Sequence, residues 1–154
     1  MNKKIFVLLA LFFAVISLSC VSAFGSLDNG TDVTVNGANF HIPEGFKSYK
    51  LVGSNPETDA DFSLYSDDGK EALAFIHIMV SDNISSDSYL SQKLSTNDKV
   101  IINGKECYIE PSSDIVSCSY YYSNDKAVQL NVPHSYMYHN KEYYYNDTLA
   151  EIIK

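Results

Sequence analysis

Two cysteines, Cys107 and Cys118, have the spacing that points most directly to a covalent bond. A turn-forming segment, Glu110–Asp114, separates them. If Ser112-Ser113 forms the tip of a hairpin, Cys107 lies opposite Cys118, and directly opposed residues bring their β-carbons close enough for a disulfide. A redox pair or a metal site is the alternative, but the chain has no Cys-x-x-Cys spacing and no histidine nearby in sequence. We therefore predict a structural disulfide between Cys107 and Cys118.

Tyrosines are concentrated near the C-terminus, where eight of the twelve follow Ser119. If Asn140-Lys141 is a tight turn, one face of a hairpin carries four of them, with Tyr138 opposite Tyr143 and Tyr136 opposite Tyr145. Tyrosine offers a broad contact area and a hydrogen bond at little entropic cost, which suits sugars or protein partners. We predict that these four residues are a candidate binding site. The alternative is an amphipathic sheet face partly covered by the last helix.

Metal binding has weaker support in the sequence. The four histidines have no zinc-type spacing, and they are His41, His77, His134 and His139. Alternate carboxylates at Glu57, Asp59 and Asp61 resemble the start of a calcium loop, but Phe62 stands where that loop needs its glycine and Asp68 where it needs glutamate. We interpret the acidic run as a solvated loop, and we predict no metal site and no cofactor.

Composition excludes some classes of function. The chain has 11 Lys and no Arg against 19 acidic residues, so its net charge is −8, and such a chain repels phosphate backbones. It contains no nucleophile elbow, phosphate loop or dinucleotide fingerprint. Two separated carboxylates can hydrolyse a glycoside, but the 19 acids do not single out a pair. The composition therefore disfavours nucleic acid as a partner, and the motifs point to no particular catalytic class.

The N-terminus has the three parts of an export signal. A basic start at 1–4 precedes twelve apolar residues at 5–16, and small residues lead to Ala23. We predict a signal peptide over 1–23, with Phe24 as the first mature residue. Lipidation of Cys20 is the alternative, but Ser17 stands where a lipid site needs leucine. Export places the protein outside the cytoplasm, secreted or associated with the cell envelope, and leaves an even cysteine count that supports the disulfide.

The mature part, 24–154, has 154 − 23 = 131 residues and fits one domain without a later membrane span. Asn36-Gly37 and Asn103-Gly104 each lie between alternating runs, which is the strongest local signal for a hairpin. Further strands are predicted at 62–65, 72–80, 115–122 and 127–132. Helices are predicted at 85–94 and 147–154. Runs of strands interrupted by one or two helices predict an α+β domain with an antiparallel sheet built from hairpins.

The stretch Phe40–Phe46, the hairpins, one helix and the closing Leu149–Ile153 together resemble small exported proteins of methanogenic archaea. Their layout is similar to the PsbP-like fold, an antiparallel sheet between helices, and the resemblance covers roughly 31–154. It implies a binding or assembly role without catalytic residues. We therefore expect an exported or envelope-associated binding module whose partner is a protein or carbohydrate at the cell surface. A small hydrolase of cell-surface polymers is the alternative.

Overall fold

A computed structural model describes residues 30–49, 53–82, 89–96 and 99–154 of the chain. The predicted signal peptide and its cleavage site lie outside these residues and stay a prediction. The first part of the predicted helix at 85–94 also lies outside them, and the described helix α2 (Tyr89–Thr96) continues two residues further than expected. Among the described residues, neither helix has the length and apolar composition that a membrane crossing requires.

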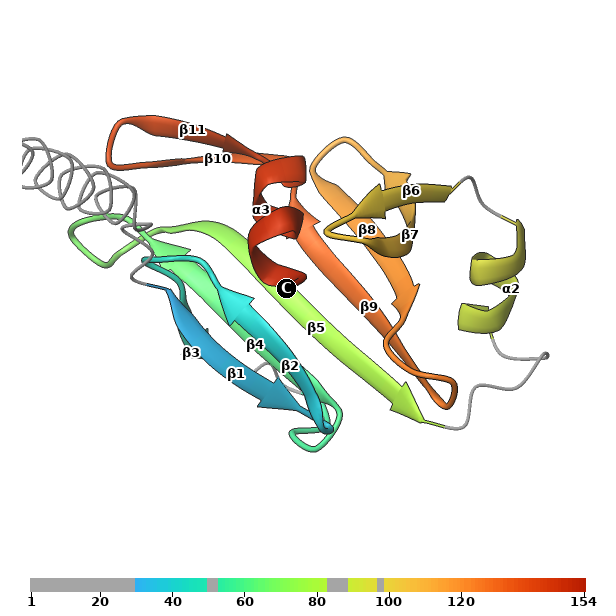
Figure 1. Cartoon of the computed structure of the whole chain (residues 1–154). Coiled ribbons are helices and arrows are strands. Elements are labelled where there is room, and N and C mark those ends of the chain that lie inside the picture. Colours follow the sequence, from blue (N-terminus) through green and yellow to red (C-terminus); the bar gives the residue numbers. More distant parts are fainter. Residues whose placement is uncertain (1–29, 50–52, 83–88, 97–98) are drawn as a thin grey trace, which may run out of the picture.

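A seven-stranded antiparallel sheet forms the centre of the fold (Figure 1). Its strands lie side by side in the order β3 (Lys47–Tyr49), β4 (Asp59–Tyr65), β5 (Ala72–Asp82), β9 (Lys126–Pro133), β8 (Ile115–Tyr121), β7 (Lys105–Pro111) and β6 (Lys99–Ile102). Most neighbours are joined by short turns, whereas the pairing of β5 with β9 joins the two halves of the sequence. The predicted α+β class with an antiparallel sheet is confirmed.

Both Asn-Gly turns form as predicted. In the hairpin of β1 (Thr31–Val35) and β2 (Ala38–Ile42), Val35 pairs with Ala38, and Asn36 and Gly37 have φ values of +43° and +75°. Two consecutive positive φ angles match the twist of the flanking strands. The second turn has the same geometry at Asn103 and Gly104, with φ values of +48° and +80°.

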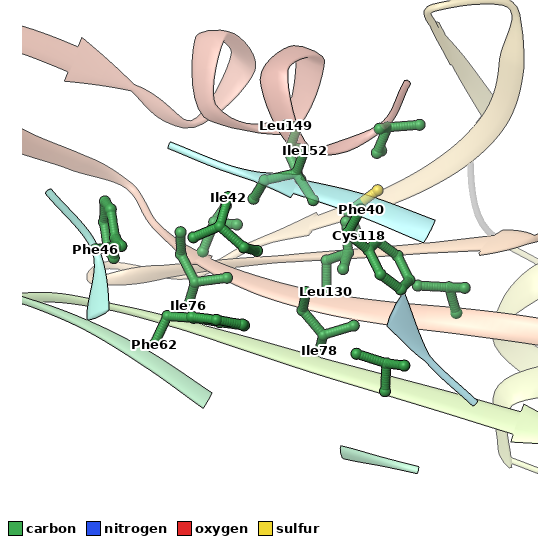
Figure 2. Packing of buried hydrophobic residues seen from close by; sticks show 14 of the residues in the cluster. Phe40, Ile42, Phe46, Phe62, Ile76, Ile78, Cys118, Leu130, Leu149 and Ile152 are labelled. Carbon is green, nitrogen blue, oxygen red and sulfur yellow. The ribbon is translucent and has the colours of Figure 1, made fainter. Parts of the chain in front are cut away.

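The C-terminal helix α3 (Tyr145–Ile152) and the β1–β2 hairpin lie on one face of the central sheet (Figure 1). Figure 2 shows Leu149 and Ile152 of α3 and Phe40 of β2 packed with Ile78 and Leu130 of the sheet. The side-chain amide of Asn103 donates to the carbonyls of Ala150 and Ile153, at 2.6 and 2.7 Å, and so holds the end of α3. This covered face contains the main core.

The opposite face of the sheet is less covered. Helix α2 lies over its β8 side, where Leu94 packs with Tyr108 and Ala127 in a small second cluster. Over β3, β4 and β5, no described element covers this face, and on β9 the helix packs at Ala127. We call the part that α2 does not reach the open face.

Candidate binding surface on the open face of the sheet

The predicted register of the cysteines is wrong. Cys107 lies opposite Tyr120, and Cys118 lies opposite Ile109, so the two cysteines are diagonal neighbours on β7 and β8. The amide of Ser112 donates to the carbonyl of Ile115 at 2.9 Å, so the tip of the turn is Ser113-Asp114, one residue later than expected. Both cysteines are buried free thiols in this structure. The disulfide itself stays a prediction.

The two thiols share a hydrogen bond within the core. The hydrogen bond to Cys107, followed by burial, raises the pKa of the Cys118 thiol. The same hydrogen bond lowers the pKa of the Cys107 thiol. The Cys107 thiol donates to the backbone carbonyl of Lys105 at 3.6 Å. Because both sulfurs are out of contact with solvent, this pair is a part of the core and not an accessible redox site.

The predicted register of the tyrosine hairpin is also wrong. In β10 (Ser135–Tyr138) and β11 (Lys141–Tyr144), Tyr136 pairs with Tyr143 and Tyr138 pairs with Lys141. The turn is His139-Asn140, one residue earlier than expected, and both residues have positive φ. Tyr145 begins α3 and leaves the hairpin, so the four predicted residues do not share one hairpin face.

These four tyrosines pack against the core. Tyr136 is buried, stacks on Tyr143 with ring centroids 5.2 Å apart, and meets Phe46 edge-on at 5.2 Å. Burial raises the pKa of the Tyr136 hydroxyl well above its usual range. Tyr138 lies close over Gly45, where an added β-carbon would meet its ring at 2.6 Å. All four rings are buried or half-buried, and a binding role for them stays a prediction.

The open face exposes large apolar side chains instead. Leu73, Phe75 and Ile115 are 47%, 51% and 49% exposed, and all three line one hollow of about 410 Å³. Leu73 also lines an adjacent hollow of about 440 Å³ with Tyr65 and Met137. We call these five residues the apolar band. Contiguous exposed apolar groups of this kind often mark an interaction site.

A row of polar residues crosses the sheet beside the apolar band. Its members pair directly from strand to strand, which places them on one face, and they are Tyr49, Asp61, His77, Asn131, Ser117 and Glu110. We call them the polar row. Directly paired residues on neighbouring strands have their β-carbons within about 5.5 Å of each other. The polar row is therefore a continuous line across β3, β4, β5, β9, β8 and β7.

The polar row contains an Asp–His pair. The Nδ1 atom of His77 lies 2.7 Å from Oδ1 of Asp61. Asp61 is buried, so the sequence-based interpretation of this residue as part of a solvated loop is wrong, and it belongs to strand β4. A carboxylate that accepts from Nδ1 fixes the tautomer of the ring, which leaves Nε2 as an acceptor. His77 is half-buried and can present that acceptor to a ligand.

The neighbouring residues of the polar row add donors and a ring. The hydroxyl of Ser117 donates to Oδ1 of Asn131 at 2.8 Å. The amide nitrogen of Asn131 can therefore act as a donor to a ligand. Tyr49 lies 6.0 Å from Phe75 between ring centroids. Burial and the nearby Asp61 carboxylate raise the pKa of the Tyr49 hydroxyl.

A second Asp–His pair lies on the other side of the molecule. His41 Nδ1 lies 2.5 Å from Oδ1 of Asp32 across the β1–β2 hairpin. These residues line a hollow of about 510 Å³ with Lys105 and Tyr122. The ring of His41 is buried, with Gly30 close to Nε2.

One hydroxyl near the Asp61–His77 pair is out of reach of solvent. Ser63 is next to Asp61 on the same strand face, but its hydroxyl is buried and has no hydrogen-bond partner among the described residues, so a substrate cannot reach it as a nucleophile. Within the part of the chain that the structure describes, no three metal-ligating side chains converge. The hollows are open and shallow, so the open face offers contacts without an enclosed reaction site.

Sequence reasoning missed the polar row. In the structure, Asp61 lies on β4 and His77 lies on β5. A short turn joins these two strands. Pairing across that turn would have brought these residues together. The contact of His77 with Asn131 had no local signal, because it depends on the long-range pairing of β5 with β9.

Comparisons with known proteins found no relatives. No family model matches this chain, and no curated protein or solved structure matches it. The function is therefore argued from the surface itself.

Proposed function

We propose that this chain is an exported or envelope-associated binding module without enzymatic activity, and that it binds through the open face. The observation that carries the proposal is the apolar band. Half-exposed Leu73, Phe75 and Ile115 lie together on a sheet whose other face is covered by a helix and a hairpin. A partner that covers the band gains the free energy of apolar burial, about 25 cal/mol for each Å².

The proposal includes a PsbP-like layout. An antiparallel sheet with few helices supports this layout at the level of fold class, and the resemblance of 31–154 to small exported archaeal proteins implies binding or assembly rather than catalysis. The export signal at 1–23 would deliver the module to the cell surface.

Sedimentation of purified 24–154 with cell envelopes of the organism that makes it tests the proposal. The double variant Leu73→Ser/Phe75→Ser should bind at least about tenfold more weakly, because central apolar anchors carry most of the binding free energy. Ile101→Ser is the matched control, because Ile101 is 66% exposed on β6, away from the band. Equal binding by the double variant and the native chain would contradict the proposal.

A small hydrolase of cell-surface polymers is the second candidate, and the Asp61–His77 pair favours it. A histidine oriented by a carboxylate can act as a general base toward water. The test is release of soluble fragments from envelopes by the native chain and by His77→Gln. Turnover that disappears in His77→Gln, with unchanged thermal unfolding, would replace the binding proposal by the enzymatic one.

A further inference from the structure

We propose that the open face binds a linear, uncharged polysaccharide that lies across the strands along the polar row. This inference rests on the proposed binding function and names the class of its ligand.

The two carboxylates of the polar row already have partners within the protein. The Asp61 carboxylate contacts His77, and the Glu110 carboxylate contacts Lys93 of α2. No arginine is present in the chain to hold a carboxylate, sulfate or phosphate group in a bidentate fork. The net charge of −8 also disfavours an anionic polymer. An uncharged ligand leaves both of these contacts intact.

The remaining polar groups of the row suit hydroxyls. A hydroxyl group both donates and accepts. His77 offers an acceptor at Nε2, because its Nδ1 is used by Asp61, and Asn131 offers donors, because its oxygen is used by Ser117. These complementary groups lie on neighbouring strands, with His77 paired directly to Asn131. A pair of adjacent sugar hydroxyls can bond to both.

Spacing favours a chain that crosses the strands. Neighbouring strands are about 4.8 Å apart, which is close to the length of one sugar unit in an extended chain. The half-buried residues His77, Asn131 and Ser117 come from three successive strands, β5, β9 and β8. Successive sugar units can therefore meet successive strands.

The apolar band provides the other half of sugar recognition. Phe75 precedes His77 by two residues on the same strand face, and Tyr49 ends the row with its ring 6.0 Å from that of Phe75. A sugar ring has polar hydroxyl edges and apolar C–H faces. Its C–H face can pack on these rings while its hydroxyls reach His77 and Asn131.

Binding of defined oligosaccharides tests the inference. The probes are hexamers of glucose, mannose and N-acetylglucosamine, with a galacturonic acid hexamer as the anionic comparison, and isothermal titration calorimetry measures the binding. At least one neutral hexamer should bind, and it should bind more tightly than the uronic acid hexamer. Failure of all three neutral hexamers, or tighter binding of the uronic acid hexamer, overturns the inference.

Two conservative variants locate the site. Asn131→Asp keeps the oxygen that Ser117 bonds but removes the amide donor, and Phe75→Leu keeps apolar area but removes the ring. Each should weaken binding of the neutral hexamer about fivefold, the usual effect of one hydrogen bond or one ring contact. The matched controls are Asn124→Asp, in the exposed turn after β8, and Tyr144→Leu, exposed on β11. Equal losses in variants and controls would contradict the placement.

Treated envelopes separate this inference from the proposed function. Periodate destroys sugars, and protease removes proteins. Binding of 24–154 that is lost after periodate and survives protease supports the polysaccharide. Binding that survives periodate and is lost after protease overturns the polysaccharide and leaves the binding module standing. Absence of binding to untreated envelopes contradicts the proposed function, whereas the purified hexamers still test the polysaccharide inference.

Discussion

Strand β5 shows how differently the two faces of the central sheet are built. Ile76 is 1% exposed and packs in the core, whereas its neighbours Phe75 and His77 lie on the open face. The covered face excludes water with helix α3 and the β1–β2 hairpin (Figure 1). The open face keeps apolar rings in solvent and holds a buried carboxylate beneath a half-buried histidine. Stability therefore depends mainly on the covered face, and exposed binding groups are concentrated on the open one.

The two Asp–His pairs differ in which of their side chains is buried. In the pair on the β1–β2 hairpin, the side chain of His41 is 8% exposed and that of Asp32 is 87% exposed. In the pair on the open face, the order is reversed, with Asp61 at 4% and His77 at 30%. A buried carboxylate needs its partner far more than an exposed one does. The same two residue types therefore have different energetic roles.

The largest effect is expected at His77. His77→Ala leaves the buried Asp61 carboxylate without its partner and should lower the free energy of unfolding by about 3 kcal/mol or more. Urea unfolding at neutral pH measures this. The double variant Asp61→Ala/His77→Ala should be more stable than His77→Ala, because it removes the unpaired charge. A loss below about 1 kcal/mol for His77→Ala would mean that Asp61 does not depend on this contact.

Neighbouring residues on β5 should separate stability from binding. Ile76→Ala creates a cavity in the core and should cost about 2–4 kcal/mol. Phe75→Ala removes a half-exposed ring and should cost less than about 1 kcal/mol, while weakening the binding of envelopes. Thermal unfolding and sedimentation of the same two proteins check both expectations. Loss of binding in Ile76→Ala at a temperature where it stays folded would contradict this separation.

The cysteine pair gives an intermediate effect on the covered face. Closing the short loop between Cys107 and Cys118 would contribute about 3 kcal/mol in the chain-entropy model. Their diagonal placement requires the strands to shift before a bond can form, because diagonal β-carbons lie further apart than a disulfide allows. We expect the exported protein to be oxidised and to gain less than about 3 kcal/mol over the Cys107→Ser/Cys118→Ser variant.

Thiol labelling of the denatured exported protein, without reductant, decides the state of the cysteines. The expected result is that neither cysteine reacts. Two labelled cysteines would show that the buried dithiol is the state of the protein after export.

The same protein, sequenced from its N-terminus by mass spectrometry, should begin at Phe24, and a lipid on Cys20 would contradict the predicted cleavage.

Local turn chemistry explains which parts of the fold could be predicted. Asn36-Gly37 and Asn103-Gly104 allow two positive φ angles without strain, so the positions of these turns were predicted correctly. The hairpins that carry the cysteines and the four tyrosines lack such a pair. Their tips lie one residue from the expected positions, at Ser113-Asp114 and His139-Asn140, and each error moves the pairing by two residues.

A shift of two residues preserves the strand face, so the predicted faces remained partly correct. Tyr136, Tyr138 and Tyr143 share one face, as expected, although their partners changed. The polar row could not be predicted in the same way. Its central contact joins β5 to β9, and the turns at either end carry no information about that pairing. A regular turn therefore identifies a hairpin, whereas a site that crosses the sheet requires the topology.

The smallest effect is expected at Asp32, and it is the sharpest test of the comparison between the two Asp–His pairs. Asp32→Ala removes an exposed carboxylate whose contact with His41 is screened by solvent, so the free energy of unfolding should fall by less than about 1 kcal/mol. His77→Ala removes the same kind of contact at almost the same distance, 2.7 Å against 2.5 Å. If the two variants lose equal stability in urea, contact distance decides the effect. If His77→Ala loses at least about 2 kcal/mol more, burial of the carboxylate decides it, as the physics of charge desolvation requires.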